Sequence, residues 1–174
     1  MRASRKEQQV VGLPRRDPAT RIHDLYLSRG QRGISDMTAN PCVFCRIIER
    51  DEPSQTIYED DHTIAFLNVA QVTKGHTLVV PRKHHRDLAE LPPDEAAQVM
   101  RTAAHVARQL TRTLQAPGIN LWHASGETAW QSVFHLHVHV VPRFTFTDLT
   151  PPWTEIEVPV ESLAGLVEEI RRRA

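Results

Sequence analysis

The chain has little cysteine, no net charge and no long apolar run, and each shortage argues against a class of protein. Only Cys42 and Cys45 occur among its 174 residues, which argues against a disulfide framework and fits a reducing compartment. Basic and acidic residues both number 21, so the charge gives no reason to expect nucleic-acid or membrane binding. No apolar run approaches the ~20 residues of a transmembrane helix, and the first residues lack the apolar core of a secretory signal. We therefore expect a cytoplasmic protein.

What the chain does contain is enough apolar material for one domain. Its residues are 40% hydrophobic and 24% charged, a composition typical of globular proteins. Residues 1–40 differ, because they hold eight basic side chains against four acidic ones and few large apolar residues. We predict that this segment is disordered or a mis-annotated extension, with Met37 as the alternative start. A targeting arm is a third interpretation, which the acidic residues disfavour.

A period-two pattern occupies the segment from Gln131 to Arg143. One face carries Phe134, Leu136, Val138 and Val140, and the other carries His135, His137, His139 and Val141. This alternation predicts a strand with one face in the core, ending near Pro142, which has no N–H for a ladder. A solvated histidine-rich edge or a simple metal patch is the alternative, and the regular apolar face disfavours it.

The other expected elements are short strands and three helices. Strands are predicted over residues 56–59, 63–69, 77–80 and 119–123, and helices over 43–49, from Pro92 to Pro117, and over 161–173. Proline and acidic residues open the second helix, and Pro117-Gly118 ends it. Strands from separate parts of the chain together with one long helix indicate an α+β fold.

These motifs together resemble the histidine triad superfamily. The segment His135-Leu-His137-Val-His139-Val-Val141 matches the family pattern His-φ-His-φ-His-φ-φ, where φ is apolar. Further matches follow the family order: Cys42-Val-Phe-Cys45, Ala65-Phe-Leu-Asn68, Gly75-His-Thr-Leu, Pro81-Arg-Lys-His84 and Gln131-Ser-Val. The resemblance covers about residues 42–147. It implies a mainly antiparallel sheet with one long and one or two short helices, usually in a two-fold homodimer. We assign residues 41–150 to this domain and 151–174 to a tail with an amphipathic helix.

The resemblance implies a nucleotide-binding hydrolase. Such an enzyme cleaves a phosphoanhydride or phosphoramidate bond at the α-phosphate of a purine nucleotide derivative, such as a dinucleoside polyphosphate, through a nucleotidyl-histidine. By position, His137 is the nucleophile, His139 protonates the leaving group or binds the phosphate, and His76 is the upstream histidine of the active site. Imidazole suits this role because it is partly neutral at pH 7 and attacks phosphorus. Taken alone, His76 reads as a capped histidine at the end of a strand.

The resemblance also implies a substrate site. Gln131 and Ser132 match the family's phosphate-binding pair, and Asn68 matches the residue that holds the ribose hydroxyls. The predicted apolar slot for the base is formed by Phe44, Phe66 and Val69. Phe66 and Val69 are equally well explained as core residues of a strand.

The loop before the triad departs from the family pattern. Ala124 stands where the family has an asparagine that contacts phosphate, and Trp130 replaces a glycine. The first change removes one hydrogen bond to a charged group, about 1.5–3 kcal/mol; His123 and Ser125 are possible substitutes. The changes keep two alternatives open: an inactive nucleotide-binding or interaction protein, and a nucleotidyltransferase or phosphorylase. The phosphorylase branch tends to have glutamine in place of the third histidine, so His139 argues against it.

Cysteine and histidine residues predict a second site, for metal. Cys42 and Cys45 offer two thiolates at zinc spacing, and the resemblance adds His84 and His135 as ligands. Two sulfurs and two nitrogens suit zinc, and four protein ligands make the site structural. We favour zinc over a redox cysteine pair because all four ligands are present. His85 is an alternative to His84. The remaining histidines, His23, His62 and His105, are interpreted as surface or helix residues.

Overall fold

The computed structural model describes residues 42–150 and 155–173. The predicted extension over residues 1–40 and part of the predicted tail, residues 151–154, lie outside the described residues. The chain divides into two compact units, one up to Phe144 and one from Thr145. Each is described by itself.

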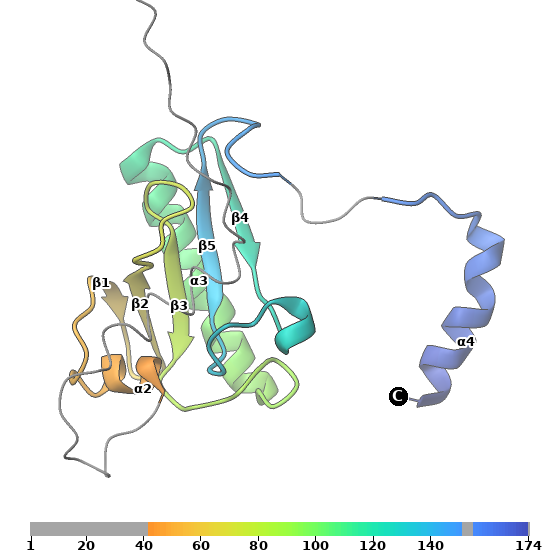
Figure 1. The fold of residues 1–174 in the computed structure, drawn as a ribbon, viewed down its shortest axis with the longest axis horizontal. Coiled ribbons are helices and arrows are strands. Elements are labelled where there is room, and N and C mark those ends of the chain that lie inside the picture. The colour runs from red at the N-terminus through yellow and green to blue at the C-terminus, as the bar shows by residue number, and fades with distance from the viewer. Residues whose placement is uncertain (1–41, 151–154, 174) are drawn as a thin grey trace, which may run out of the picture. The chain divides into compact units, whose positions relative to one another are not determined.

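The first unit is built on one antiparallel sheet (Figure 1). Its strands are β1 (Thr56–Glu59), β2 (Thr63–Leu67), β3 (Thr77–Pro81), β4 (Gly118–Trp122) and β5 (Val138–Arg143). The strand order is β1-β2-β3-β5-β4, and every neighbouring pair is antiparallel. The predicted α+β fold, with one long helix and short helices on a mainly antiparallel sheet, is confirmed. β4 forms one edge of the sheet, and β5, which carries His139, lies beside it.

Helices cover both faces of this sheet. The long helix α3 (Pro93–Leu114) runs behind the strands in Figure 1, and its apolar stripe packs against Val138 and Val140 of β5. The short helix α2 (Val43–Ile48) contributes Phe44 and Ile47 to a second cluster with residues of β2 and β3. Helix α3 begins at a proline followed by two acidic residues, as its sequence predicts.

The triad segment is only partly a strand. The ladder begins at Val138, whereas the alternation of apolar and polar residues extends upstream of it. Before the strand, the backbone N–H of Leu136 donates to the carbonyl oxygen of His85 at 2.7 Å. The two faces still alternate, because Leu136 is in the cluster beneath α3 while the rings of His135 and His137 contact Phe44. The strand ends at Arg143, one residue after Pro142.

The second unit contains a short 3-10 turn, η2 (Val160–Leu163), followed by α4 (Ala164–Arg173). The expected helix over residues 161–173 is present, with its first residues in the 3-10 turn. Its apolar residues Leu166, Val167 and Ile170 are exposed within this unit. Among the helices of the described residues, none is both long and apolar enough to cross a membrane.

Candidate active site and metal centre

His137 is buried, with one ring nitrogen fixed. Its Nδ1 lies 2.8 Å from the carbonyl oxygen of His135. A carbonyl only accepts hydrogen bonds, so Nδ1 carries the proton and Nε2 keeps its lone pair. Burial is the main cause that lowers the pKa of His137 to about 4, assisted by nearby imidazoles. At pH 7 this ring is therefore neutral and presents an unprotonated nitrogen, as a nucleophile requires.

His139 and His76 form a pair beside this ring. His139 Nδ1 lies 2.8 Å from His76 Nε2, and the two rings stack with centroids 5.1 Å apart. On its other side, His76 Nδ1 faces the carbonyl oxygen of Ala70 at 3.2 Å and the amide nitrogen of Asn68 at 3.4 Å. Burial lowers the pKa of His139 to about 3 and also lowers the pKa of His76. The structure thus brings together the three histidines predicted to be catalytic.

The loop between β2 and β3 is organised by Gln71, a residue that sequence reasoning missed. Its side-chain nitrogen donates to the carbonyl oxygens of Asn68 and His76, at 2.6 and 2.7 Å. Its side-chain oxygen accepts from the backbone N–H groups of Gly75 and His76. Gly75 has φ of 88°, and a Cβ there would collide with Leu114. The Gly75-His76 motif and the Gln71 side chain therefore together fix the backbone that positions His76. No local sequence pattern identifies Gln71 as the residue that makes these hydrogen bonds.

The predicted slot for the base has two buried members and one exposed member. Phe44 and Phe66 are 1% and 3% exposed and meet edge to face, and the Phe44 ring lies 5.2 Å from that of His137. Both are therefore core side chains, and Phe44 packs directly against the ring of His137. Val69 is 69% exposed and follows the buried Asn68, whose Oδ1 accepts from the Ala70 N–H at 3.0 Å.

Gln131 has its amide engaged by the backbone, while its neighbour Ser132 is exposed. The Gln131 Oε1 accepts from the N–H of Gly126 at 2.7 Å, and Nε2 donates to the carbonyl oxygen of Arg86 at 2.6 Å. Gln131 thus shapes the loop that precedes the triad. Of this predicted phosphate pair, only Ser132 has its side chain at the surface.

His123 and Ser125 connect this loop to the backbone of His137. His123 Nδ1 lies 2.9 Å from the carbonyl oxygen of His137, and its Nε2 lies 2.9 Å from Ser125 Oγ. Since the carbonyl accepts, Nδ1–H donates and Nε2 accepts from the serine hydroxyl. Between them, Ala124 is buried. The two residues thus position the His137 backbone, a contact that depends on the pairing of β4 with β5 and has no local sequence signal.

The four predicted metal ligands meet in one cluster. The ligand atoms of Cys42, Cys45, His84 and His135 all lie within 4.8 Å of one another. Sulfur-to-nitrogen distances are 3.5 Å between Cys42 and His135 and 3.3 Å between Cys45 and His84. A zinc tetrahedron with bonds of about 2.3 Å to sulfur and 2.0–2.1 Å to nitrogen has edges of about 3.5 Å. The residues therefore fit zinc.

A second contact orients His135 within this cluster. Its Nε2 donates to the carbonyl oxygen of Pro81 at 3.0 Å, which leaves Nδ1 facing the sulfurs. Burial lowers the pKa of His135 to about 4, so the ring is neutral at pH 7. The alternative ligand His85 turns elsewhere, with Nε2 2.8 Å from Glu95 Oε2.

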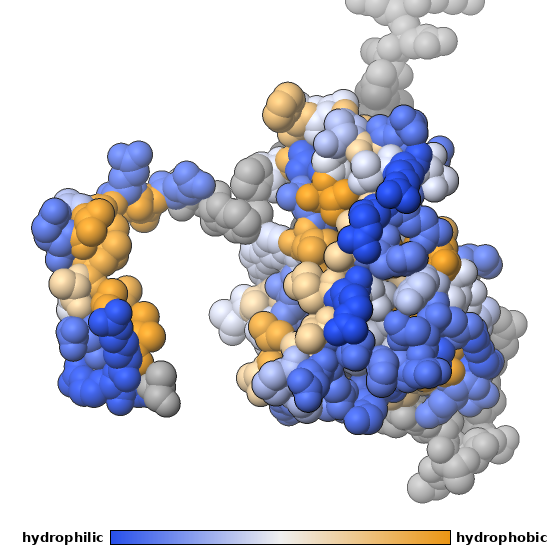
Figure 2. All heavy atoms as spheres, turned by 180° about the vertical axis from the view of Figure 1, so that it is seen from behind, coloured by the Kyte–Doolittle hydropathy of each residue, from blue (hydrophilic) through white to orange (hydrophobic). Residues whose placement is uncertain are grey.

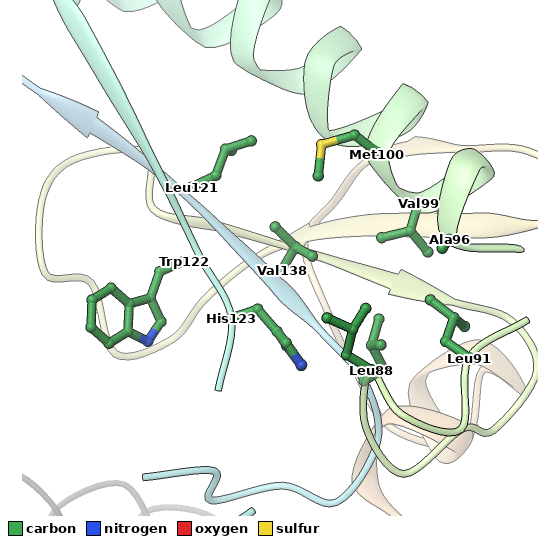
Figure 3. Close-up of a pocket in the computed structure, with 10 residues that line it drawn as sticks. Leu88, Leu91, Ala96, Val99, Met100, Leu121, Trp122, His123 and Val138 are labelled. Carbon is green, nitrogen blue, oxygen red and sulfur yellow. The ribbon is translucent and has the colours of Figure 1, made fainter. Parts of the chain in front are cut away.

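An apolar pocket of about 260 Å³ lies on the α3 side of the sheet (Figure 3). Its walls come from α3, β4, β5 and the loop before α3: Leu88, Leu91, Ala96, Val99, Met100, Leu121, Trp122, His123, Leu136 and Val138. The triad imidazoles lie on the other side of β5, so this pocket is distinct from the candidate active site.

Comparison with known proteins agrees with this geometry. Residues 49–146, more than half of the chain, match the sequence model of the HIT domain. The chain belongs to the HIT family. Protein hit of Bacillus subtilis is 43% identical over 106 residues, covering 61% of this chain and 73% of that one. The resemblance recognised in the sequence is confirmed, and at family level it supports a nucleotide-binding hydrolase or transferase.

Two further HIT proteins bear on activity and metal. Adenylylsulfatase HINT3 of Arabidopsis thaliana is 33% identical over 132 residues, covering 75% of this chain and 67% of that one. A crystal structure of a zinc-bound histidine triad family protein from Mycobacterium smegmatis is 34% identical, with a TM-score of 0.61, and covers 77% of this chain and 98% of that one. The family thus includes a hydrolase and a zinc-bound member.

Proposed function

We propose that this HIT protein hydrolyses a phosphoanhydride or phosphoramidate bond at the α-phosphate of a purine nucleotide derivative. The observation that carries the proposal is the state of His137, a buried neutral imidazole whose Nδ1–H is held by the His135 carbonyl oxygen at 2.8 Å. This contact fixes the tautomer in which Nε2 is the nucleophilic nitrogen.

The reaction proceeds in two steps. His137 Nε2 attacks the α-phosphorus, a nitrogen–phosphorus bond forms, and the bond from phosphorus to the leaving group breaks with its electron pair on the leaving group. The resulting nucleotidyl-imidazolium keeps its Nδ1–H on the His135 carbonyl, which stabilises the positive charge. Water then attacks the phosphorus, the nitrogen–phosphorus bond breaks with its electron pair on Nε2, and the attacking water gives a proton to solvent, which releases the nucleoside monophosphate and restores neutral His137.

His139 serves the leaving group. In the free protein His139 is neutral, because burial lowers its pKa. A bound anionic phosphate raises the pKa of a neighbouring imidazole, so His139 gains a proton when substrate binds and hydrogen-bonds the phosphate or protonates the departing group. His76, 2.8 Å from His139 Nδ1, orients that ring.

The nucleotide lies along the triad face of the sheet. Asn68, next to His76, is proposed to hold the ribose hydroxyls, and the exposed Val69 contacts the base. Phe44 and Phe66 form the floor beneath them. At the other end of the triad, the Ser132 hydroxyl donates to phosphate, and Gln131 fixes the backbone that carries it.

Zinc is proposed at Cys42, Cys45, His84 and His135, in a structural role. The support is the fit of the sulfur-to-nitrogen distances to a zinc tetrahedron and the zinc-bound relative. Four protein ligands leave no position for substrate. The metal would tie α2 to the residues just before β5, so that His135 holds metal while its neighbour in the triad does chemistry.

We also propose that two copies pair along β4. This strand is a sheet edge, and exposed edges favour pairing with another chain. Beside it, Leu88, Met100 and Leu121 are 56%, 52% and 43% exposed around the apolar pocket. Figure 2 shows apolar residues gathered in a band on this side of the first unit. Sedimentation should give a dimer, and Leu121→Asp should give a monomer.

The test of the activity uses two substrates, a diadenosine polyphosphate and an adenosine phosphoramidate. Wild type should hydrolyse at least one of them, and His137→Ala should abolish turnover while retaining zinc. Added inorganic phosphate separates the hydrolase from the phosphorylase alternative, because a phosphorylase would transfer the nucleotidyl group to phosphate. Binding without turnover by zinc-loaded wild type would instead support the nucleotide-binding protein, the alternative that Ala124 favours.

A further inference from the structure

Trp130 combines a backbone conformation that suits glycine with a surface position. Its φ of 69° and ψ of 27° lie in the left-handed region, which is unfavourable for residues with a Cβ. The side chain is 64% exposed. Within residues 42–150 and 155–173, the indole makes no hydrogen bond and no aromatic contact. Neither local conformation nor burial explains a tryptophan at this position.

The two other non-glycine residues with positive φ in the described ranges provide the contrast. Arg50 places its guanidinium 2.7 Å from the Glu59 carboxylate, and Gln115 donates to the carbonyl oxygen of Arg112 at 2.7 Å. Each side chain therefore makes an intramolecular contact that stabilises its strained residue. Among the residues that the structure describes, the Trp130 indole makes no comparable hydrogen bond or ring contact, and strained backbone is enriched at residues that contact a ligand.

The loop presents this indole on a fixed frame. The backbone N–H of Trp130 donates to the carbonyl oxygen of Glu127 at 2.8 Å, closing the 3-10 turn η1 (Glu127–Ala129). The next residue, Gln131, is buried and joins the loop to Gly126 and to Arg86. A ring held in this way loses little conformational freedom when another ring packs on it.

The position of the loop identifies which part of a substrate would reach it. The loop joins β4 to β5 and is tied to the His137 carbonyl through Ser125 and His123. The loop that carries Asn68, where the ribose and base are proposed to bind, lies at the opposite end of β5 (Figure 1). A group that reaches Trp130 is therefore on the far side of the scissile phosphate from the nucleoside.

We propose that Trp130 stacks on an aromatic ring in the leaving group, so that the enzyme selects nucleotide derivatives with an aromatic leaving group over aliphatic ones. The proposal rests on the proposed function and specifies its substrate class. Offset stacking of two rings contributes enough to raise kcat/KM by about two- to tenfold over a non-aromatic ring of the same size.

A matched pair of substrates tests the proposal. Two adenosine 5′-phosphoramidates, one of 2-phenylethylamine and one of 2-cyclohexylethylamine, differ in aromaticity but hardly in size. Wild type should prefer the phenyl compound by about two- to tenfold in kcat/KM. Trp130→Gly, which suits the left-handed backbone and should therefore fold, should bring this ratio to about one, and Trp130→Phe should keep part of it.

Trp130→Leu is the matched control, because it keeps an apolar side chain without a π face. It should also lose the preference, and a ratio that survives in Trp130→Gly or Trp130→Leu overturns the proposal. Failure of the proposed function looks different, since neither compound would then be hydrolysed by wild type. In that case, the dissociation constants of the two compounds are measured by calorimetry on wild type and on the Trp130→Gly variant. If the ratio of the two constants is the same in both proteins, or if neither compound binds, the stacking proposal is overturned.

Discussion

His135 and His137 are the same side chain two residues apart, both buried, yet they present different ring nitrogens. His135 donates from Nε2 to the Pro81 carbonyl and turns Nδ1 toward two sulfurs. His137 donates from Nδ1 to the His135 carbonyl and keeps Nε2 for the substrate site. Burial lowers both pKa values to about 4. The backbone oxygen that each ring contacts, rather than the side-chain type or its pKa, thus separates the proposed metal ligand His135 from the proposed nucleophile His137.

The largest effect should come from removing only the nucleophilic nitrogen. His137→Asn can still donate from its amide to the His135 carbonyl but has no Nε2, so turnover should fall by at least about a thousandfold. Zinc content and melting temperature should remain near those of wild type. Activity should be measured with the two substrates named above, and residual turnover within tenfold of wild type would reject His137 as the nucleophile.

Substitution of His135, two residues before His137, should change the zinc content and the stability that His137→Asn leaves near those of wild type. His135→Ala should lose zinc and several kcal/mol of folding free energy, about the scale expected when a structural metal is lost. Metal analysis and urea unfolding would measure both. The matched control is His85→Ala, which removes the adjacent imidazole that contacts Glu95 and should keep zinc. Zinc retained by His135→Ala, or lost by His85→Ala, would reverse the ligand assignment.

The dependence of the free energy of unfolding on pH should report on His139, the triad histidine that follows His135 and His137 and lies outside the predicted metal cluster. The folded-state pKa of His139 is about 3, below its ordinary value of 6.5, so the unfolded chain binds a proton that the folded chain excludes. The stabilising contribution is fully present above pH 6.5 and decreases as the pH falls, by up to ~1.4 kcal/mol per pH unit. Urea unfolding at pH 7, 6 and 5 should show a steeper loss for wild type than for His139→Gln, and parallel curves would contradict this.

A smaller effect is expected for the residue that holds the nucleophile's backbone. His123→Phe removes the hydrogen bond to the His137 carbonyl, which is typically worth about 0.5–1.5 kcal/mol. We expect kcat/KM to fall by about three- to tenfold with zinc unchanged. His105→Phe is the control, because His105 lies on α3 against Tyr58 and should leave kcat/KM unaltered; an equal loss in both variants would mean that the effect is general.

The elements of the fold could be predicted because their signals are local. Proline and acidic residues mark the start of α3, and short apolar runs mark β2 and β3. The start of β5 could not be read from alternation, because Leu136 uses its N–H on the carbonyl of His85 instead of on a neighbouring strand. Periodicity reports which face is buried, whereas the ladder depends on which backbone groups meet in three dimensions.

In the candidate site too, features with a sequence signal could be predicted, whereas features that depend on tertiary contacts could not. The spacing of Cys42 and Cys45 alone suggested a metal site, and the resemblance to the histidine triad superfamily predicted the remaining members of both clusters that the fold assembles. The roles of Gln71 and His123 were not visible, because each joins backbone groups brought together only by strand pairing. Sequence also could not separate the buried Phe66 from the exposed Val69, since both follow the same strand pattern.

His135 takes part in both centres at once, through different atoms. Its ring belongs to the metal cluster, and its own carbonyl oxygen selects the reactive tautomer of His137. If the His135 ring loses its contacts in the metal cluster, the carbonyl oxygen of His135 is held less firmly against Nδ1 of His137. If zinc binds at this cluster as proposed, its removal should therefore lower turnover as well as stability, because the metal and the reactive tautomer of His137 depend on the same residue.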